Sequence, residues 1–222
     1  MKYLLFLCFV VFGFFNAFGQ ERYVRPIDEA AKDASFLAFR TKLIEAAKRR
    51  DTKYILSIVD RKIEISFGGL VGIEDFKKTW KLSNSNSEFW KEFLAVITNG
   101  GTFVEESGSK MFFAPYTFGT FPEDLDGFEY SAIFGNNVNL RAKPDLRSKA
   151  IAQLSYNVVK VDYQNSVKKK GAKDEYSWLK IETLGGKKGF VKAEFVRSPI
   201  AYRAGFEKKN GKWKMTVFIA GD

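Results

Sequence analysis

Apolar residues recur at helical spacing in the first half of the chain. Phe36, Phe39 and Leu43 are separated by three or four residues, as on the buried stripe of a helix. Asp33 or Ser35 is suited to cap the start of this helix, because its side-chain oxygen can accept from the first free amide groups. Similar stripes predict three more helices, which we place at residues 54–59, 72–82 and 87–97.

Strict alternation of apolar and polar residues follows the second of these helices. Ile63, Ile65 and Phe67 alternate with polar residues, which predicts a half-buried strand ended by two glycines. From residue 107 to residue 128 the pattern is loose, and we expect a linker or a strand-rich connection. Its acidic segment 122–127 lacks the spaced oxygen ligands of a calcium loop, so we interpret it as a solvated turn.

Short alternating segments with turn residues between most of them begin at Tyr130. Several such strands within about 70 residues indicate a small all-β barrel. After it, Asn210 and Gly211 predict a tight turn between two strands of a terminal hairpin. A lone hairpin is marginal in water, so we expect this one to pack on the first half of the chain. The barrel strands are predicted at residues 130–134, 137–141, 149–154, 158–164, 176–183 and 187–191.

These patterns together predict an α+β N-terminal domain that a C-terminal hairpin completes, with an all-β barrel inserted between them. The predicted boundaries are 20–128 for the α+β domain, 129–198 for the barrel and 199–222 for the hairpin. Trp80, Phe89 and Trp90 could line a ligand pocket in the first domain. We favour the core for them, because aromatic residues at helical spacing are usually buried.

The barrel segment resembles the bacterial SH3-like (SH3b) family in three places, which occur in the family's order. The resemblance implies a small barrel that recognises cell-wall peptides or glycan. The matching residues are Val138, Asn139, Leu140, Arg141, Ala142 and Pro144; then Trp178, Lys180 and Ile181; then Gly186, Gly189, Phe190, Val191, Phe195 and Val196. Ser155, Tyr156 and Asn157 depart from the family, which often has a glycine-rich turn there. Helices followed by a sheet that ends in a hairpin resemble the cone-shaped α+β fold of the nuclear-transport-factor type.

Residues 1–19 have the pattern of a secretory signal peptide. Lys2 precedes an apolar stretch that ends in small residues, and we predict cleavage before Gln20. The stretch is short for a membrane span, which needs roughly 20 apolar residues. Cys8 lies in the middle of the stretch, which argues against a lipid-modified cysteine. We therefore expect a secreted or periplasmic protein with no membrane anchor after cleavage.

Composition limits the chemistry of the mature chain. The sequence has no histidine, and its single cysteine is Cys8 in the predicted signal. Disulfides, thiol nucleophiles, imidazole catalysis and zinc sites built on these side chains are thereby excluded. We expect no cofactor, no metal and no enzymatic activity.

Positive charge is concentrated in the barrel. Residues 129–198 hold 14 Lys and Arg against 7 Asp and Glu, a net charge of +7, whereas residues 20–128 hold 16 against 17. This charge suits an anionic partner, although it also serves solubility. Secretion argues against nucleic acid as the partner.

We predict that the protein binds a cell-wall component or another envelope protein through the barrel, without catalysis. The barrel aromatics could form a stacking surface, or they could be core; we favour Trp178 and Phe190 as core and Tyr163 as an exposed contact. The candidate ligand-binding residues are Arg141, Lys143, Tyr163, Tyr176 and Trp178.

A small-ligand carrier or a carboxylate-based enzyme, using a cavity in the first domain, is the alternative hypothesis. Paired carboxylates perform acid and base catalysis without histidine. The candidates are Asp60, Glu64, Glu74 and Asp75, whose spacing does not distinguish them from ordinary surface charge.

Overall fold

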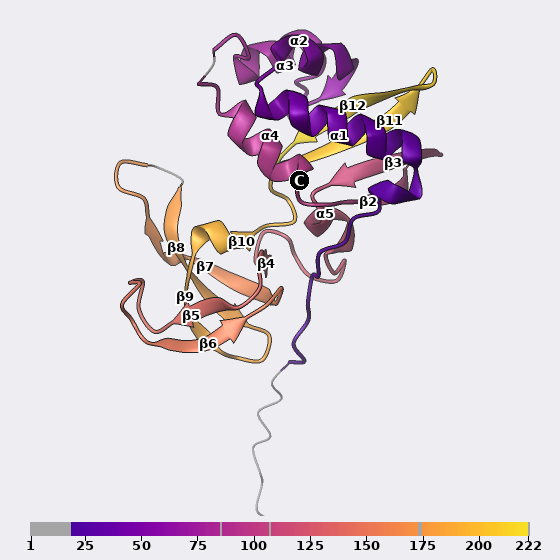
Figure 1. Ribbon diagram of the computed structural model, residues 1–222. Helices are drawn as coiled ribbons and strands as arrows, with labels where there is room; N and C mark the ends of the chain where they lie inside the picture. The colour runs from indigo at the N-terminus through magenta and orange to yellow at the C-terminus, as the bar shows by residue number, and fades with distance from the viewer. Residues whose placement is uncertain (1–18, 85, 107, 173–174, 222) are drawn as a thin grey trace, which may run out of the picture.

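The computed structural model describes residues 19–84, 86–106, 108–172 and 175–221 (Figure 1). The predicted signal peptide therefore lies almost wholly outside the described residues. The helices are η1 (Ala30–Lys32), α1 (Ala34–Lys48), α2 (Thr52–Ile58), α3 (Ile73–Trp80), α4 (Phe89–Ile97), α5 (Tyr116–Thr120) and η2 (Ala193–Phe195). The strands are β1 (Val59–Glu64), β2 (Thr102–Glu106), β3 (Ser109–Ala114), β4 (Tyr130–Ile133), β5 (Val138–Arg141), β6 (Ala150–Leu154), β7 (Val158–Lys168), β8 (Tyr176–Thr183), β9 (Lys188–Lys192), β10 (Val196–Arg197), β11 (Arg203–Lys209) and β12 (Lys212–Ile219).

The first sheet combines strands from both ends of the chain. Its order is β1-β12-β11-β3-β2, so the terminal hairpin β11–β12 lies between strands of the first half. β11 pairs antiparallel with β3, and β12 pairs parallel with β1. The hairpin turn is at Asn210 and Gly211, where the sequence predicts it; their φ angles of 50° and 75° are the left-handed values that a tight hairpin turn needs.

An aromatic core joins this sheet to helices α1 and α4, which lie over one of its faces in Figure 1. The Phe36 ring of α1 lies 4.2 Å from that of Phe112 on β3 and 4.8 Å from that of Trp213 on β12. Trp80 and Phe89 are buried in the same core, as is Trp90. The core interpretation of these three residues is therefore correct.

One expectation for the first half was wrong in detail, and the strand-rich alternative for the segment after residue 107 is the correct one. Phe67 was predicted on the buried side of a strand, but β1 ends at Glu64 and the Phe67 side chain is exposed. The loose segment after residue 107 contains β3, a well-buried inner strand of the sheet. Its Met111, Phe112 and Phe113 are consecutive buried residues, so both of its faces are covered and no alternation marks it.

The second sheet curls into the barrel, with strand order β10-β4-β7-β8-β9-β5-β6. Inward residues of successive strands meet in one apolar cluster, as alternation requires. Val138 and Leu140 belong to it, as predicted. The other buried members are Ile133, Leu154, Val159, Val161, Leu179, Ile181 and Val191.

A third apolar cluster joins the two halves of the protein. Val24 and Tyr116 from the first half pack with Ala132 and Val158 of the barrel, and the Tyr116 ring stacks on Phe134 at 5.4 Å. This small cluster positions the barrel against the first sheet.

Polar contacts cross the same junction. Val24 N donates to Tyr156 O at 2.8 Å, so an N-terminal segment lies along the barrel backbone. Arg197 of β10 lies 3.6 Å from Glu92 of α4 and donates to the carbonyl oxygen of Tyr202 at 2.6 Å. The domain boundaries at 128/129 and 198/199 stay predictions. Within the described residues, no helix is long and apolar enough to cross a membrane.

Gly189 is where β9 passes closest to β5, and we expect Gly189→Ala to destabilise the protein by about 1–3 kcal/mol through overpacking. A Cβ atom there would lie 2.6 Å from the carbonyl oxygen of Arg141 and 3.0 Å from Leu140. Chemical denaturation measures the change in the free energy of unfolding. Gly68→Ala is the control, since its Cβ would meet its nearest neighbour, Ser66, at an ordinary 3.5 Å. Equal stability of the two variants would show that the β5–β9 contact is looser than described.

Burial at the junction raises the pKa of Tyr116 from 10.0 to about 12, with neighbouring Tyr156 as the second cause. The unfolded chain therefore ionises this phenol at lower pH than the folded protein does. The resulting stability is complete below pH 10 and is lost as pH rises toward 12. We expect Tyr116→Phe to lose less stability across this range than the parent protein, whereas Tyr23→Phe, at an exposed position, should follow the parent. Denaturation midpoints measured at a series of alkaline pH values test this.

Candidate ligand-binding face of the barrel

Strand pairing brings charged and aromatic side chains together on the outside of the barrel. Directly paired residues of an antiparallel sheet project to the same side, and their neighbours along each strand project to the other. Leu179 pairs with Val191 and both face the barrel interior, so the residues on either side of them face outward. We call this outward surface the barrel face; its rows across the strands are Lys160, Glu182 and Lys188; Asp162, Lys180, Phe190 and Arg141; and Val167, Trp178 and Lys192.

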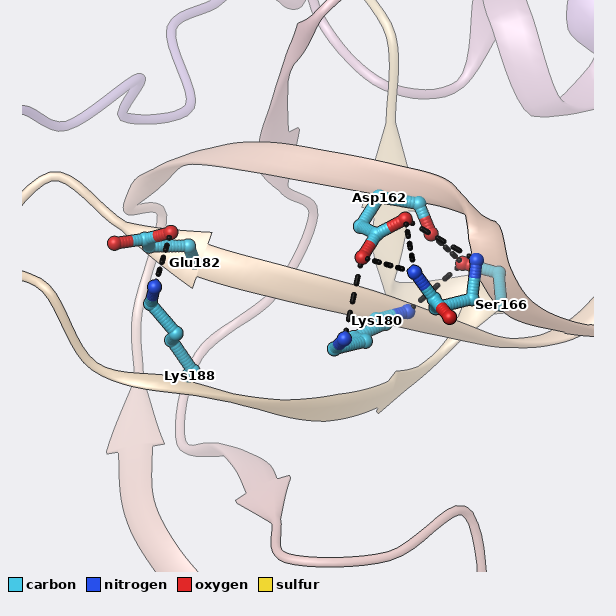
Figure 2. Close-up of polar contacts among 6 residues, drawn as sticks. Asp162, Ser166, Lys180, Glu182 and Lys188 are labelled. Carbon is cyan, nitrogen blue, oxygen red and sulfur yellow. Dashed lines mark hydrogen bonds and ion pairs between the residues drawn. The ribbon is translucent and has the colours of Figure 1, made fainter.

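Ion pairs neutralise the lysines of the barrel face. Lys180 lies 3.2 Å from Asp162, and Lys188 lies 3.1 Å from Glu182 (Figure 2). Lys160 lies 2.8 Å from Glu129. Such exposed pairs contribute roughly 0–1 kcal/mol each to stability. The barrel face therefore has carboxylates beside its lysines, although its basic residues outnumber its acidic ones.

The excess positive charge of the barrel is shared between its strands, which hold seven basic and two acidic side chains, and its connecting segments. Residues 142–149 hold three basic and one acidic side chain, and residues 168–175 hold four basic and two acidic ones. Each loop thus has a net charge of +2. Lys143, in the first of them, is exposed.

An irregularity in β7 displaces Tyr163 from the regular ladder. Asp162 and Val167 are five positions apart in the chain, whereas their partners Lys180 and Trp178 on β8 are two positions apart. Bulges of this kind redirect side chains. Tyr163 is 39% exposed, and its ring lies 5.6 Å from that of Tyr176.

Polar side chains fix the shape of this irregularity (Figure 2). The Asp162 carboxylate accepts from the amide side chain of Asn165 at 2.9 Å and from its backbone N–H at 3.1 Å. The hydrogen bond from the Asn165 side chain is the main reason why the pKa of Asp162 lies below its usual value, and Lys180 lowers it further. The Ser166 hydroxyl donates to Asp162 O at 2.7 Å and accepts from Lys180 N at 2.9 Å.

Three grooves open on or beside the barrel face. The first, of about 530 Å³, contains Tyr163, Lys180 and the ion pairs of Figure 2. The second, of about 770 Å³, lies between α4 and the barrel, where Lys91 faces Tyr176 and Trp178. The third, of about 180 Å³, is bordered by Arg141, Trp178, Leu146 and Phe195.

The structure divides the predicted site residues among these grooves instead of gathering them in one. Tyr163 lines the first groove, Tyr176 and Trp178 the second, and Arg141 the third along with Trp178. Lys143 lines none of the three. The guanidinium of Arg141 donates to Ser148 O at 2.7 Å, so part of its role is to hold the loop that follows β5.

The prediction that Trp178 and Phe190 are core residues was wrong. Both are half-buried and belong to the barrel face. Alternation shows that Trp178 and Leu179 point to opposite sides, but it does not show which side is inside. The sequence reasoning also missed Phe128 and Lys160 in the first groove and Lys91 in the second. Lys91 belongs to α4, and no pattern in the sequence connects it to the barrel.

The carboxylates of the enzyme hypothesis are dispersed. Asp60 lies 3.4 Å from Lys209, and Glu74 lies 2.8 Å from Lys77. Glu64 borders a shallow groove of about 340 Å³ on the other face of the first sheet. Among the described residues, no group of three or more Asp, Glu, His or Cys side chains could hold a metal ion. The carrier or enzyme function stays a hypothesis.

Residues 136–197 match the bacterial SH3 domain (SH3_3) family model. The chain therefore carries a bacterial SH3 domain, which confirms the resemblance seen in the sequence. No curated protein and no solved structure matches the chain. Bacterial SH3 domains commonly bind cell-wall components. The resemblance of the first half to the nuclear-transport-factor type stays a prediction.

Ser166 connects β7 to β8, and we expect Ser166→Ala to reduce the free energy of unfolding by about 1 kcal/mol. The substitution removes the acceptor of the Lys180 N–H group and the donor to Asp162 O. Ser177→Ala is the matched control: its hydroxyl donates to Val167 O at 3.0 Å, and water can replace a donor to an exposed carbonyl. Urea denaturation of both variants measures the difference. A larger loss for Ser177→Ala would contradict this assignment.

Proposed function

We propose that the protein is a secreted or periplasmic, non-catalytic binding protein that recognises a cell-wall peptide through the barrel face. The observation that carries the proposal is the bacterial SH3 domain at residues 136–197. Its location in the envelope rests on the signal-peptide pattern of residues 1–19.

The distribution of charge favours a peptide that carries both signs of charge. A groove of paired lysines and carboxylates offers a partner for an ammonium group as well as for a carboxylate. Cell-wall peptides contain free carboxylates and, where they are not cross-linked, a free amine. The basic loops on either side add attraction for the overall anionic wall.

Tyr163 supplies an apolar contact within that groove. The residue is 39% exposed and borders the groove beside the ion pairs of Lys180 and Lys160, while partial burial raises the pKa of its phenol. The Asp162–Asn165 bonds hold its strand segment in place. A rigid aromatic side chain buries area at little cost in conformational entropy, which is why such residues dominate binding energy. We therefore assign Tyr163 the main contact in the first groove.

Co-sedimentation of the mature protein with purified peptidoglycan tests the proposal. We expect the parent protein to sediment with the peptidoglycan and Tyr163→Ala to bind at least fivefold more weakly, as loss of about 1 kcal/mol or more implies. Phe67→Ala is the matched control, because it removes an exposed aromatic outside the barrel and should leave binding unchanged. Absence of binding by the parent protein would refute the proposal. Equal binding by Tyr163→Ala would place the contact elsewhere.

A further inference from the structure

A crevice of about 370 Å³ lies between the barrel and the first half of the protein, away from the three grooves described above. It falls in the size range of small-molecule sites, which occur preferentially at domain junctions. Five separate chain segments border it: residues 26–28, the end of α4 at residues 98–100, Tyr116 of α5, residues 134–135, and Tyr156. Because both halves contribute, the crevice exists only in the assembled protein.

Tyr156 is held in an unfavourable backbone conformation at the edge of this crevice. Its φ angle is 62°, a left-handed value that glycine adopts freely but that is rare for a bulky side chain. Its backbone is fixed on both sides, because its N–H donates to Gly135 O at 3.1 Å and its carbonyl accepts from Val24 N at 2.8 Å. The position belongs to the Ser155–Asn157 turn, where the sequence departs from a glycine-rich pattern. Strained residues of this kind cluster at ligand-binding sites.

The left-handed backbone of Tyr156 places its phenol in a wall that also contains the Tyr116 and Phe134 rings. The Tyr116 and Phe134 rings are stacked with an interplanar angle of 10°, and both line the crevice. Tyr116 and Tyr156 are close enough for their phenols to interact electrostatically. Pro26 and Ile27 complete the apolar part of the wall on its exposed side. The crevice therefore has flat apolar surfaces with hydroxyl groups at their edges.

The polar groups of the wall suit hydroxyl groups rather than a charged ligand. None of the residues that line the crevice is a lysine or an arginine. The Asp28 carboxylate is already bound by both terminal nitrogens of Arg40, which neutralises its charge. A phenol, a threonine hydroxyl and an amide such as that of Asn99 serve as both donors and acceptors. An anionic ligand finds no cation here, whereas it would find several in the basic loops of the barrel.

We propose that this crevice binds a neutral saccharide, with its ring packed on Tyr156 and its hydroxyls bonded to the polar rim. A sugar ring presents an apolar face of C–H groups and an edge of hydroxyls, which matches both parts of the wall. The inference extends the proposed function from wall peptide to wall glycan. It rests on the crevice alone, since none of its lining residues belongs to the barrel face.

Tyr156→Gly separates binding from folding. Glycine relieves the left-handed strain, so we expect this variant to melt at the same temperature as the parent protein or higher, and to bind at least tenfold more weakly. Tyr156→Phe keeps the ring without its hydroxyl and should bind severalfold more weakly. Asn137→Gly is the matched control: Asn137 has a φ angle of 55° but lies outside the crevice, so stability should hold or rise and binding should not change.

The probe is chitotetraose, a neutral oligosaccharide without peptide, titrated into the mature full-length protein and followed by isothermal calorimetry. Binding by the parent protein and its loss in Tyr156→Gly, with Asn137→Gly unchanged, supports the inference. No binding by the parent protein, or equal binding by Tyr156→Gly, overturns it. Sedimentation with peptidoglycan in the absence of chitotetraose binding would leave the proposed function intact and reject the crevice. Binding of chitotetraose without sedimentation with peptidoglycan would reject the peptide proposal.

Discussion

The central position of β11 is the constraint on which the rest of the structure depends. This strand forms backbone hydrogen bonds with β3 on one side and β12 on the other, so the chain must return to the first sheet after the barrel. The points where the chain enters and leaves the barrel consequently lie together: the Ser198 hydroxyl donates to Gly127 O at 3.2 Å. Because the chain crosses between the first sheet and the barrel twice, at neighbouring points, the rotation of the barrel relative to the sheet is restricted. The apolar cluster around Tyr116 and the contact of Arg197 with Glu92 then fix its orientation. The crevice at Tyr156 is a product of that orientation.

Charge on the barrel is organised by strand register. Because lysines and carboxylates pair across β7, β8 and β9, part of the positive charge of the sheet is compensated locally. A net charge of +7 for the segment would suggest a uniformly attractive surface for anions, but the paired groups compete with any ligand for the same lysines.

Sequence patterns predicted the elements whose signals are local. The Asn210–Gly211 turn, the helix from Ala34 and the alternating barrel strands all follow from residues within a few positions of one another. The segment of β3 was predicted only as a linker or a strand-rich connection, because consecutive buried residues remove the alternation. Trp178 was placed in the core because a tryptophan is usually buried, yet the pleat places it opposite Leu179. The crevice could not be foreseen, since its five segments are distant in the chain and only the packing of two sheets brings them together.

The place of the terminal hairpin in the first sheet also sets an order of events during synthesis. β1, β2 and β3 are made early, but β1 and β3 do not touch each other; β11 and β12 separate them. Helices α1 to α4 therefore have an incomplete sheet to pack on until residues 203–219 have been made. The barrel, whose strands are contiguous in the chain, has all its partners before then. The half of the protein that emerges first is consequently the half that finishes folding last, and its aromatic core stays uncovered in the meantime.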